Sequence, residues 1–241
     1  MLNNRLNETT IGTAKVIVDI VPKGYCIPNT KITPTSITIH NTGNVNASAK
    51  NNHNYMKNIN KSGERIASWH FTVGYDEIYQ AQSCNYKCYH AGCNAGNNTS
   101  IGIEICMYSD KTKQYKAYKN AIALVKILMK YYKFDTSQVK RHYDWSKKHC
   151  PAYLIEGKYG YTWSWFKKEI ELDAASDRIQ NEFKIKVYNC TTLNARSGPG
   201  TSYPVKDTVK VGTILTIVGE SGNWYKTKSG LYVSKSYCKK I

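Results

Sequence analysis

The chain has 241 residues, of which 41% are hydrophobic and 12% aromatic. This length and composition suit a medium-sized globular domain with a small companion, and they exclude an intrinsically disordered chain. Lysine and arginine number 34 against 17 aspartates and glutamates, so the net charge is +17. Such a surface attracts nucleic acid, anionic lipid or phosphate-rich wall polymers, and charge alone does not choose among these partners.

The N-terminal sequence MLNNRLNETTIGTAKVIVDIV lacks the basic segment and apolar run of a secretory signal. No apolar run reaches the length of a membrane span. We therefore expect a protein made in the cytoplasm, without membrane insertion, which another factor must release if it works outside the cell. The eight cysteines then favour reduced thiols or metal ligands over a disulfide scaffold.

The first predicted elements are strands at residues 36–42, 70–76 and 100–106, and the clearest helix is at residues 116–134. The apolar stripe of this helix comprises Tyr118, Ile122, Val125, Met129 and Tyr132. Its lysines occupy the remaining surface and predict a solvated face. Alternating strands and helices predict an α/β domain with a mixed central β-sheet flanked by helices.

A polar stretch at residues 172–182 has no apolar period and predicts a linker after a first domain of residues 1–171. Residues 183–241 contain short β-type runs separated by SGPG and other glycine turns. This pattern predicts a small all-β barrel. With ten Lys/Arg and two Asp/Glu, this second domain is the more densely basic one.

Two predicted strands carry polar residues on one face. Ile37 and Ile39 share a face of the first strand, and His40 points to the other. In SIGIEIC the isoleucines again share a face, opposite Gly102 and Glu104. If helices bury both isoleucine faces, His40 and Glu104 emerge together on the other side of the sheet. Gly102 would leave room there for a ligand.

The segment VKRHYDWSKKHCP places His142 and Cys150 eight residues apart. Together with His40 they supply two imidazoles and one thiolate, a three-ligand zinc set that leaves a coordination position open for water. Asp144 could orient a ligand histidine from behind. The adjacent His149 is a weaker ligand candidate, because neighbouring side chains on a loop diverge. Spacing alone leaves open both a zinc site and an ordinary basic, aromatic surface segment.

Four segments carry a resemblance to a known family. SITIHNT, ASWHFTV, YHAGCNAGNNTSIGIEI and HYDWSKKHCP occur in the order found in zinc-dependent N-acetylmuramoyl-L-alanine amidases of the phage lysozyme and peptidoglycan-recognition type. The likeness covers about residues 35–165. The C-terminal LNARSGPGTSYPV and GESGNWYKTKSGLYVSKSY resemble a bacterial SH3-like (SH3b) wall-binding domain. The pairing resembles a phage endolysin, or alternatively an autolysin, of a Gram-positive wall.

The resemblance implies an enzyme that hydrolyses the amide between N-acetylmuramic acid and L-alanine and thereby lyses Gram-positive cells. It implies that His40, His142 and Cys150 hold one catalytic zinc ion. Lys148 matches the lysine that stabilises the oxyanion, and Glu104 matches the general base of several family branches. The implied partners are peptidoglycan and anionic wall polymers.

The resemblance also places His90 in the substrate groove, and Trp69 and His70 are further candidates for substrate binding. Packing for structure is an equal alternative for His70. Some phage members have a tyrosine where this chain has Trp69, and an indole cannot replace a phenol in proton transfer. More of the proton transfer should then fall on Glu104. Ala152 replaces a frequent family glycine after the Cys-Pro pair, which affects the loop rather than a ligand.

In the second domain, an aromatic and basic groove could bind a wall peptide or glycan. Its candidate residues are Arg196, Tyr203, Trp224 and Tyr232. For a barrel this small, about half of them are equally well explained as core.

Two other function classes remain open beside the amidase. Binding-only peptidoglycan-recognition proteins typically lack the cysteine ligand, whereas this chain has Cys150. A nucleic-acid-binding protein is motivated by charge alone and gives no reason for a zinc set, so we expect no nucleic-acid partner. Cys84, Cys88 and Cys93 are best explained as free thiols, although a second metal site or a late disulfide is an alternative. A late disulfide between Cys190 and Cys238 is a further possibility.

Overall fold

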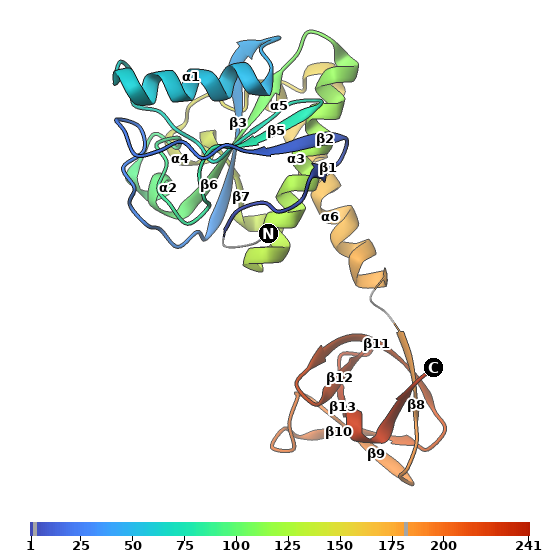
Figure 1. Ribbon diagram of the computed structural model, residues 1–241. Helices are drawn as coiled ribbons and strands as arrows, with labels where there is room; N and C mark the ends of the chain where they lie inside the picture. The colour runs from blue at the N-terminus through green and yellow to red at the C-terminus, as the bar shows by residue number, and fades with distance from the viewer. Residues whose placement is uncertain (2–3, 181–182) are drawn as a thin grey trace. The chain divides into compact units, whose positions relative to one another are not determined.

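The computed structural model describes residue 1, residues 4–180 and residues 183–241, with the backbone alone for residues 172–180. It divides into two units, Met1–Glu171 and Leu172–Ile241 (Figure 1). The first is an α/β unit and the second is dominated by β-strands. No helix among the described residues is long and apolar enough to cross a membrane.

Among the described residues of the first unit, seven strands form a mixed sheet in the order β1-β2-β5-β4-β6-β3-β7. Their bounds are β1 Thr10–Ile11, β2 Ala14–Val18, β3 Ser36–Val45, β4 Phe71–Val73, β5 Glu77–Gln80, β6 Ser100–Met107 and β7 Val139–Arg141. Strand β3 lies between β6 and β7 and is parallel to both. The predicted mixed sheet is confirmed.

The helices of this unit are α1 Ala49–Ser62, α2 Asn94–Thr99, α3 Lys111–Tyr132, α4 His142–Ser146, α5 Ala152–Ile155 and α6 Trp163–Gln180, with 3-10 turns at Thr136–Gln138 and Lys158–Gly160. Helix α1 begins at a capping box, in which the Ser48 side chain accepts from the Asn51 N–H and the Asn51 side chain accepts from the Ser48 N–H. It ends at Gly63, whose φ of 72° is the left-handed conformation that glycine adopts at low cost.

The two faces of the sheet are covered differently (Figure 1). Helix α3 packs on the face that carries the isoleucines of β3 and β6, and these residues form one buried cluster with its Tyr118, Ile122 and Val125. Helix α1 lies against β4 and β5, where Met56 and Trp69 belong to a separate buried cluster. His40 and Glu104 therefore face away from α3, as the alternation of the strands predicts.

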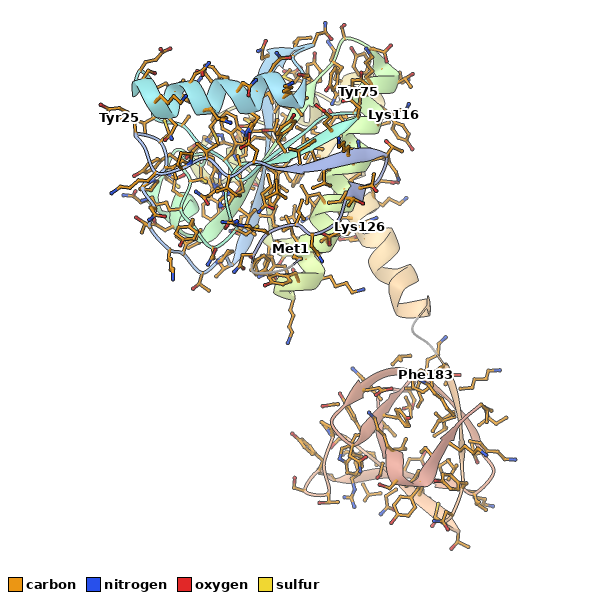
Figure 2. The ribbon with its side chains drawn as sticks, viewed as in Figure 1. Met1, Tyr25, Tyr75, Lys116, Lys126 and Phe183 are labelled. Atoms are coloured by element: carbon orange, nitrogen blue, oxygen red, sulfur yellow. The ribbon has the colours of Figure 1, made fainter. Side chains whose placement is uncertain are left out.

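The lysines of α3 lie mostly on its exposed side, where Figure 2 labels Lys116 and Lys126. Tyr118, Ile122 and Val125 are buried on the opposite side. The predicted amphipathic helix is confirmed, although it begins five residues earlier than expected, after Asp110. The Asp110 carboxylate accepts from the Lys113 N–H at 2.7 Å and caps this end.

The second unit contains, among its described residues, one antiparallel sheet in the order β10-β9-β13-β12-β11-β8-β14. Its strands are β8 Phe183–Val187, β9 Thr192–Arg196, β10 Val205–Lys210, β11 Ile214–Ser221, β12 Trp224–Thr227, β13 Tyr232–Ser234 and β14 Cys238–Lys240, with a 3-10 turn at Lys235–Tyr237. A small core of Ile185, Val187, Leu193, Ile217 and Val233 fills it. The all-β character predicted for residues 183–241 is confirmed. Residues 172–180 of the expected linker continue α6, and residues 181–182 lie outside the described residues.

The first prediction concerns a pair of like charges in this sheet. Lys186 of β8 lies directly opposite Lys239 of β14, and both side chains are exposed. Like charges directly opposite each other on a strand pair are destabilising, whereas a pair of opposite charges stabilises by roughly 0.2–1 kcal/mol. Lys186→Glu should therefore raise the unfolding temperature of this unit, measured by calorimetry on the full chain.

The matched control is Lys206→Glu, which makes the same charge change where the strand register pairs no residue with Lys206. This variant should change the unfolding temperature less. An equal rise in both variants would mean that net charge, rather than the cross-strand pair, limits the stability of this unit.

Candidate functional site

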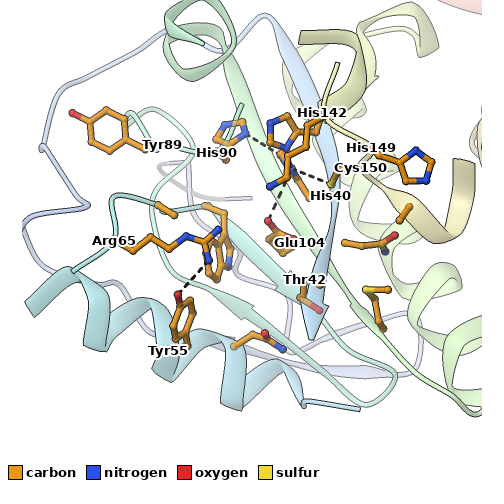
Figure 3. Close-up of a pocket in the computed structure, with 18 residues that line it drawn as sticks. His40, Thr42, Tyr55, Arg65, Tyr89, His90, Glu104, His142, His149 and Cys150 are labelled. Carbon is orange, nitrogen blue, oxygen red and sulfur yellow. Dashed lines mark hydrogen bonds and ion pairs between the residues drawn. The ribbon is translucent and has the colours of Figure 1, made fainter. Parts of the chain in front are cut away.

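A cavity of about 360 Å³ opens on the face of the first unit that α3 does not cover (Figure 3). Most of the site residues predicted from the sequence line it: His40, Trp69, His90, Glu104, His142, Lys148 and Cys150. The exposed His149 also lies at this cavity, but its Nε2 pairs with Glu156 at 2.9 Å. The structure thus brings residues from four distant segments of the chain to one place.

Strand register explains why these segments meet. His40 of β3 lies directly opposite Glu104 of β6, and Ile39 lies opposite Arg141 of β7. Strand β7 ends at Arg141, so His142, the first residue of α4, lies beside His40. Helix α4 ends at Lys147 in a left-handed conformation, and the chain then turns back towards the sheet.

A backbone hydrogen bond closes this loop, because the Tyr143 N–H donates to the Cys150 carbonyl at 2.9 Å. The Cys150 thiol is thereby brought to the two histidines. His40 Nδ1 lies 3.0 Å from His142 Nδ1 and 3.8 Å from Cys150 Sγ. All three side chains are buried, and one ligand atom from each lies within 4.8 Å of the others.

These three side chains form the one group of His, Cys, Asp and Glu residues among the described part of the chain that is close enough to share a metal ion. Cys84, Cys88 and Cys93 do not form such a group there. All eight cysteines are free thiols in this structure, including Cys190 and Cys238.

Burial sets the protonation of the cluster. It lowers the pKa of His142 to about 4 and that of His40 well below its usual value, so both imidazoles are neutral near pH 7. Burial raises the pKa of the Cys150 thiol to about 12. A thiolate there needs a nearby cation to stabilise it, and a metal ion would supply that charge. Two neutral imidazoles and one such thiol fit a tetrahedral metal site with one open position.

Glu104 places a buried carboxyl in the site. Its Oε1 lies 4.0 Å from His40 Nδ1. Its Oε2 is buried without a hydrogen-bond partner among the described residues. Burial raises the pKa of this carboxyl to about 8, while Lys148 and Arg65 act to lower it. A carboxyl whose pKa lies near neutrality can both take up and release a proton.

Lys148 supplies the positive charge at this end of the cavity. Its side chain is exposed, and its charge acts to lower the pKa of both His40 and His142. It stands two residues before Cys150, whose N–H donates to the Lys148 carbonyl at 2.7 Å. The segment that places the thiol therefore also places the lysine.

Two sequence predictions need correction. Asp144 does not orient a histidine, because its carboxylate accepts from the Arg141 N–H at 2.8 Å and pairs with the Arg141 side chain at 2.7 Å. It caps α4 instead. His70 lies outside the cavity lining and is fully buried. Its Nδ1 accepts from the Gly102 N–H at 2.9 Å and its Nε2 donates to the Tyr86 carbonyl at 2.8 Å, so its role is structural.

Sequence reasoning missed the far wall of the cavity. Tyr55, Arg65 and Tyr89 line it, and the Arg65 guanidinium donates to the Tyr55 hydroxyl at 3.3 Å (Figure 3). Tyr55 comes from α1, and Arg65 and Tyr89 come from loops. No motif or period marks Tyr55 and Arg65, and Tyr89 begins the segment YHAGCNAGNNTSIGIEI without having been singled out.

The second unit has its own hollow, lined in part by Arg196, Trp224 and Tyr237. The Arg196 guanidinium donates to the carbonyls of Thr201 and Tyr203, which ties it to the neighbouring loop. Tyr203 and Tyr232 are not among the lining residues. Of the four predicted wall-binding residues, the hollow therefore brings together Arg196 and Trp224.

Each of the two units matches a known protein family. Residues 30–153 match the N-acetylmuramoyl-L-alanine amidase family, which is about half of the chain. Residues 191–239 match the bacterial SH3 domain. These matches agree with the resemblances of the two parts of the sequence.

Proteins similar to this chain are also N-acetylmuramoyl-L-alanine amidases. N-acetylmuramoyl-L-alanine amidase XlyA of Bacillus subtilis is 40% identical over 160 residues, covering 64% of this chain and 50% of that protein. CwlA of the same organism is 34% identical over 200 residues, which cover 78% of this chain and 69% of CwlA. The chain thus spans between half and about two thirds of the length of these two relatives.

Among solved structures, the catalytic domain of XlyA has a TM-score of 0.58 and 39% identity, covering 65% of this chain and 99% of that domain. The structure of PlyL has a TM-score of 0.55 and 32% identity, and the match covers 65% of this chain and 96% of the PlyL chain. The family match, the relatives and the shared fold lead to one conclusion: this chain belongs to the N-acetylmuramoyl-L-alanine amidase family.

Proposed function

We propose that the protein is a zinc-dependent N-acetylmuramoyl-L-alanine amidase. It would hydrolyse the amide bond between the lactyl group of N-acetylmuramic acid and L-alanine in peptidoglycan. The observation that carries this proposal is the buried cluster of His40, His142 and Cys150, which shares one cavity with Glu104 and Lys148. Family membership supports the reaction type.

His40, His142 and Cys150 would hold the zinc ion through two imidazole nitrogens and a thiolate, a donor set that suits zinc. When bound, zinc would polarise the amide carbonyl and make water a stronger nucleophile near neutral pH. The two imidazoles are already neutral, so both can offer a lone pair without first losing a proton.

Glu104 would accept a proton from the attacking water and later deliver it to the L-alanine nitrogen, which leaves as an amine. Its unpaired Oε2 and its raised pKa support this role. Lys148 would place its ammonium beside the oxygen that gains negative charge when the carbonyl is attacked. Trp69 and Tyr89 would line the groove for the substrate.

The second unit would hold the enzyme on the cell wall. Its family match supports this role, and the net charge of +17 favours a wall rich in anionic polymers. We propose a Gram-positive wall as the target and an endolysin as the kind of enzyme. The likeness to a solved mutant endolysin from Bacillus subtilis, with 37% identity and a TM-score of 0.58, supports this kind of enzyme.

The second prediction is that Cys150→Ser loses zinc. A serine hydroxyl does not ionise readily, so the cluster would keep two strong ligands instead of three. We expect about one zinc ion per wild-type chain, as a mononuclear site requires, and well below that in the variant after dialysis. Metal content is measured by plasma mass spectrometry, and amidase activity should be lost in parallel.

Cys93→Ser is the matched control, because Cys93 caps α2 through its side chain and serine can replace it there. This variant should retain zinc and activity. Full zinc content in Cys150→Ser would contradict the assigned ligand set.

The third prediction separates the proton acceptor from the metal ligands. Glu104→Gln keeps the shape of the side chain but removes its basicity. The rate of amide hydrolysis should therefore fall by about 10²–10⁴-fold while the zinc content is unchanged. The rate is measured as new free amino groups on purified Gram-positive walls.

Glu156→Gln serves as its control, because Glu156 is exposed and pairs with His149 rather than with the cluster. Near wild-type hydrolysis by Glu104→Gln would exclude Glu104 as the base. Wild type that holds zinc but releases no amino groups would instead indicate a protein that only recognises the wall.

A further inference from the structure

The imidazole of His40 makes two kinds of contact, one at each ring nitrogen. Its Nδ1 faces His142 and Cys150, and its Nε2 lies 3.0 Å from Nδ1 of His90. His90 in turn places its Nε2 3.2 Å from the carbonyl oxygen of Ser100. A chain of hydrogen bonds therefore runs from a backbone carbonyl of β6 through His90 to the proposed ligand His40.

The direction of this chain follows from its last member. A carbonyl oxygen can only accept, so Nε2 of His90 must carry the hydrogen. Neutral His90 then has a lone pair on Nδ1, which accepts from Nε2–H of His40. Neutral His40 is left with its lone pair on Nδ1, the atom that faces His142 and Cys150. The backbone carbonyl of Ser100 thus selects the tautomer of His40 through His90.

The position of His90 is fixed on several sides. The N–H groups of His90 and Ala91 both donate to the Asn97 side-chain oxygen, at 2.9 and 2.8 Å. The His90 ring lies over Gly102 of β6, where an added Cβ would stand 2.7 Å from the ring. Gly102 therefore leaves room for His90, whereas the sequence had suggested room for a ligand.

From this geometry we infer that His90 is a positioning residue that holds His40 in the tautomer and orientation able to bind the metal ion. This inference rests on the proposed function, since it concerns the same metal site. The role of His90 is then to orient His40, rather than to contact the substrate as the sequence analysis expected. His90 is only 8% exposed, and both of its ring nitrogens are engaged in the hydrogen-bond chain.

The test measures metal affinity in the full-length chain. Partners that orient a ligand histidine typically contribute about 10–100-fold to metal affinity. His90→Ala should therefore weaken zinc binding by about this factor, measured by competition with a chelator. His90→Asn should recover part of the loss, because its side-chain oxygen can accept from Nε2 of His40. In cobalt-loaded protein, His90→Ala should also change the visible absorption bands that report ligand geometry.

Two further variants complete the design. Gly102→Ala should weaken zinc binding as well, because its methyl group would displace the His90 ring. His53→Ala removes a different buried histidine, which pairs with Asp19 and lies outside the cavity lining. It controls for general destabilisation and should leave zinc affinity unchanged.

The outcomes separate this inference from the proposed function. Wild type that binds no zinc would contradict both. Zinc-binding wild type with unchanged zinc affinity and cobalt spectrum in His90→Ala would overturn the inference alone. In that case, a rise in KM for wall fragments would return His90 to substrate binding.

Discussion

The site depends on the register in which β3 pairs with β6. This register aligns the isoleucines of the two strands beneath α3, and the same alignment puts His40 opposite Glu104 on the other face. A slip of one residue would turn the polar side chains into the core and expose the isoleucines. Burial of apolar surface on one side of the sheet therefore fixes the distance between the proposed ligand and the proposed base on the other.

Much of this arrangement could be predicted because a strand alternates with a period of two. The pattern of SITIH and SIGIEIC was enough to put His40 and Glu104 on a common face, and the structure agrees. The spacing of His142 and Cys150 identified them as candidates. It did not reveal how they meet, because that depends on the left-handed turn at Lys147 and the closing hydrogen bond from Tyr143.

The remaining differences come from hydrogen-bond partners that the residue pattern does not reveal. Asp144 was expected beside a histidine, but Arg141 offers a backbone N–H and a guanidinium within one helical turn. His70 and His90 look equivalent in sequence. Only the fold shows that His70 is held by two backbone groups, whereas His90 reaches His40. Arg65 follows no periodic pattern, so its place on the cavity wall could not be anticipated.

The bond that this protein breaks in the cell wall is the measurement that bears most directly on its proposed function. Purified Gram-positive walls would be treated with the full-length chain, and the released material analysed by amino-terminal labelling and mass spectrometry. We expect stem peptides that begin with free L-alanine and glycan strands without new reducing ends. New reducing ends, or new amino termini at any other residue, would rule out the proposed amidase activity.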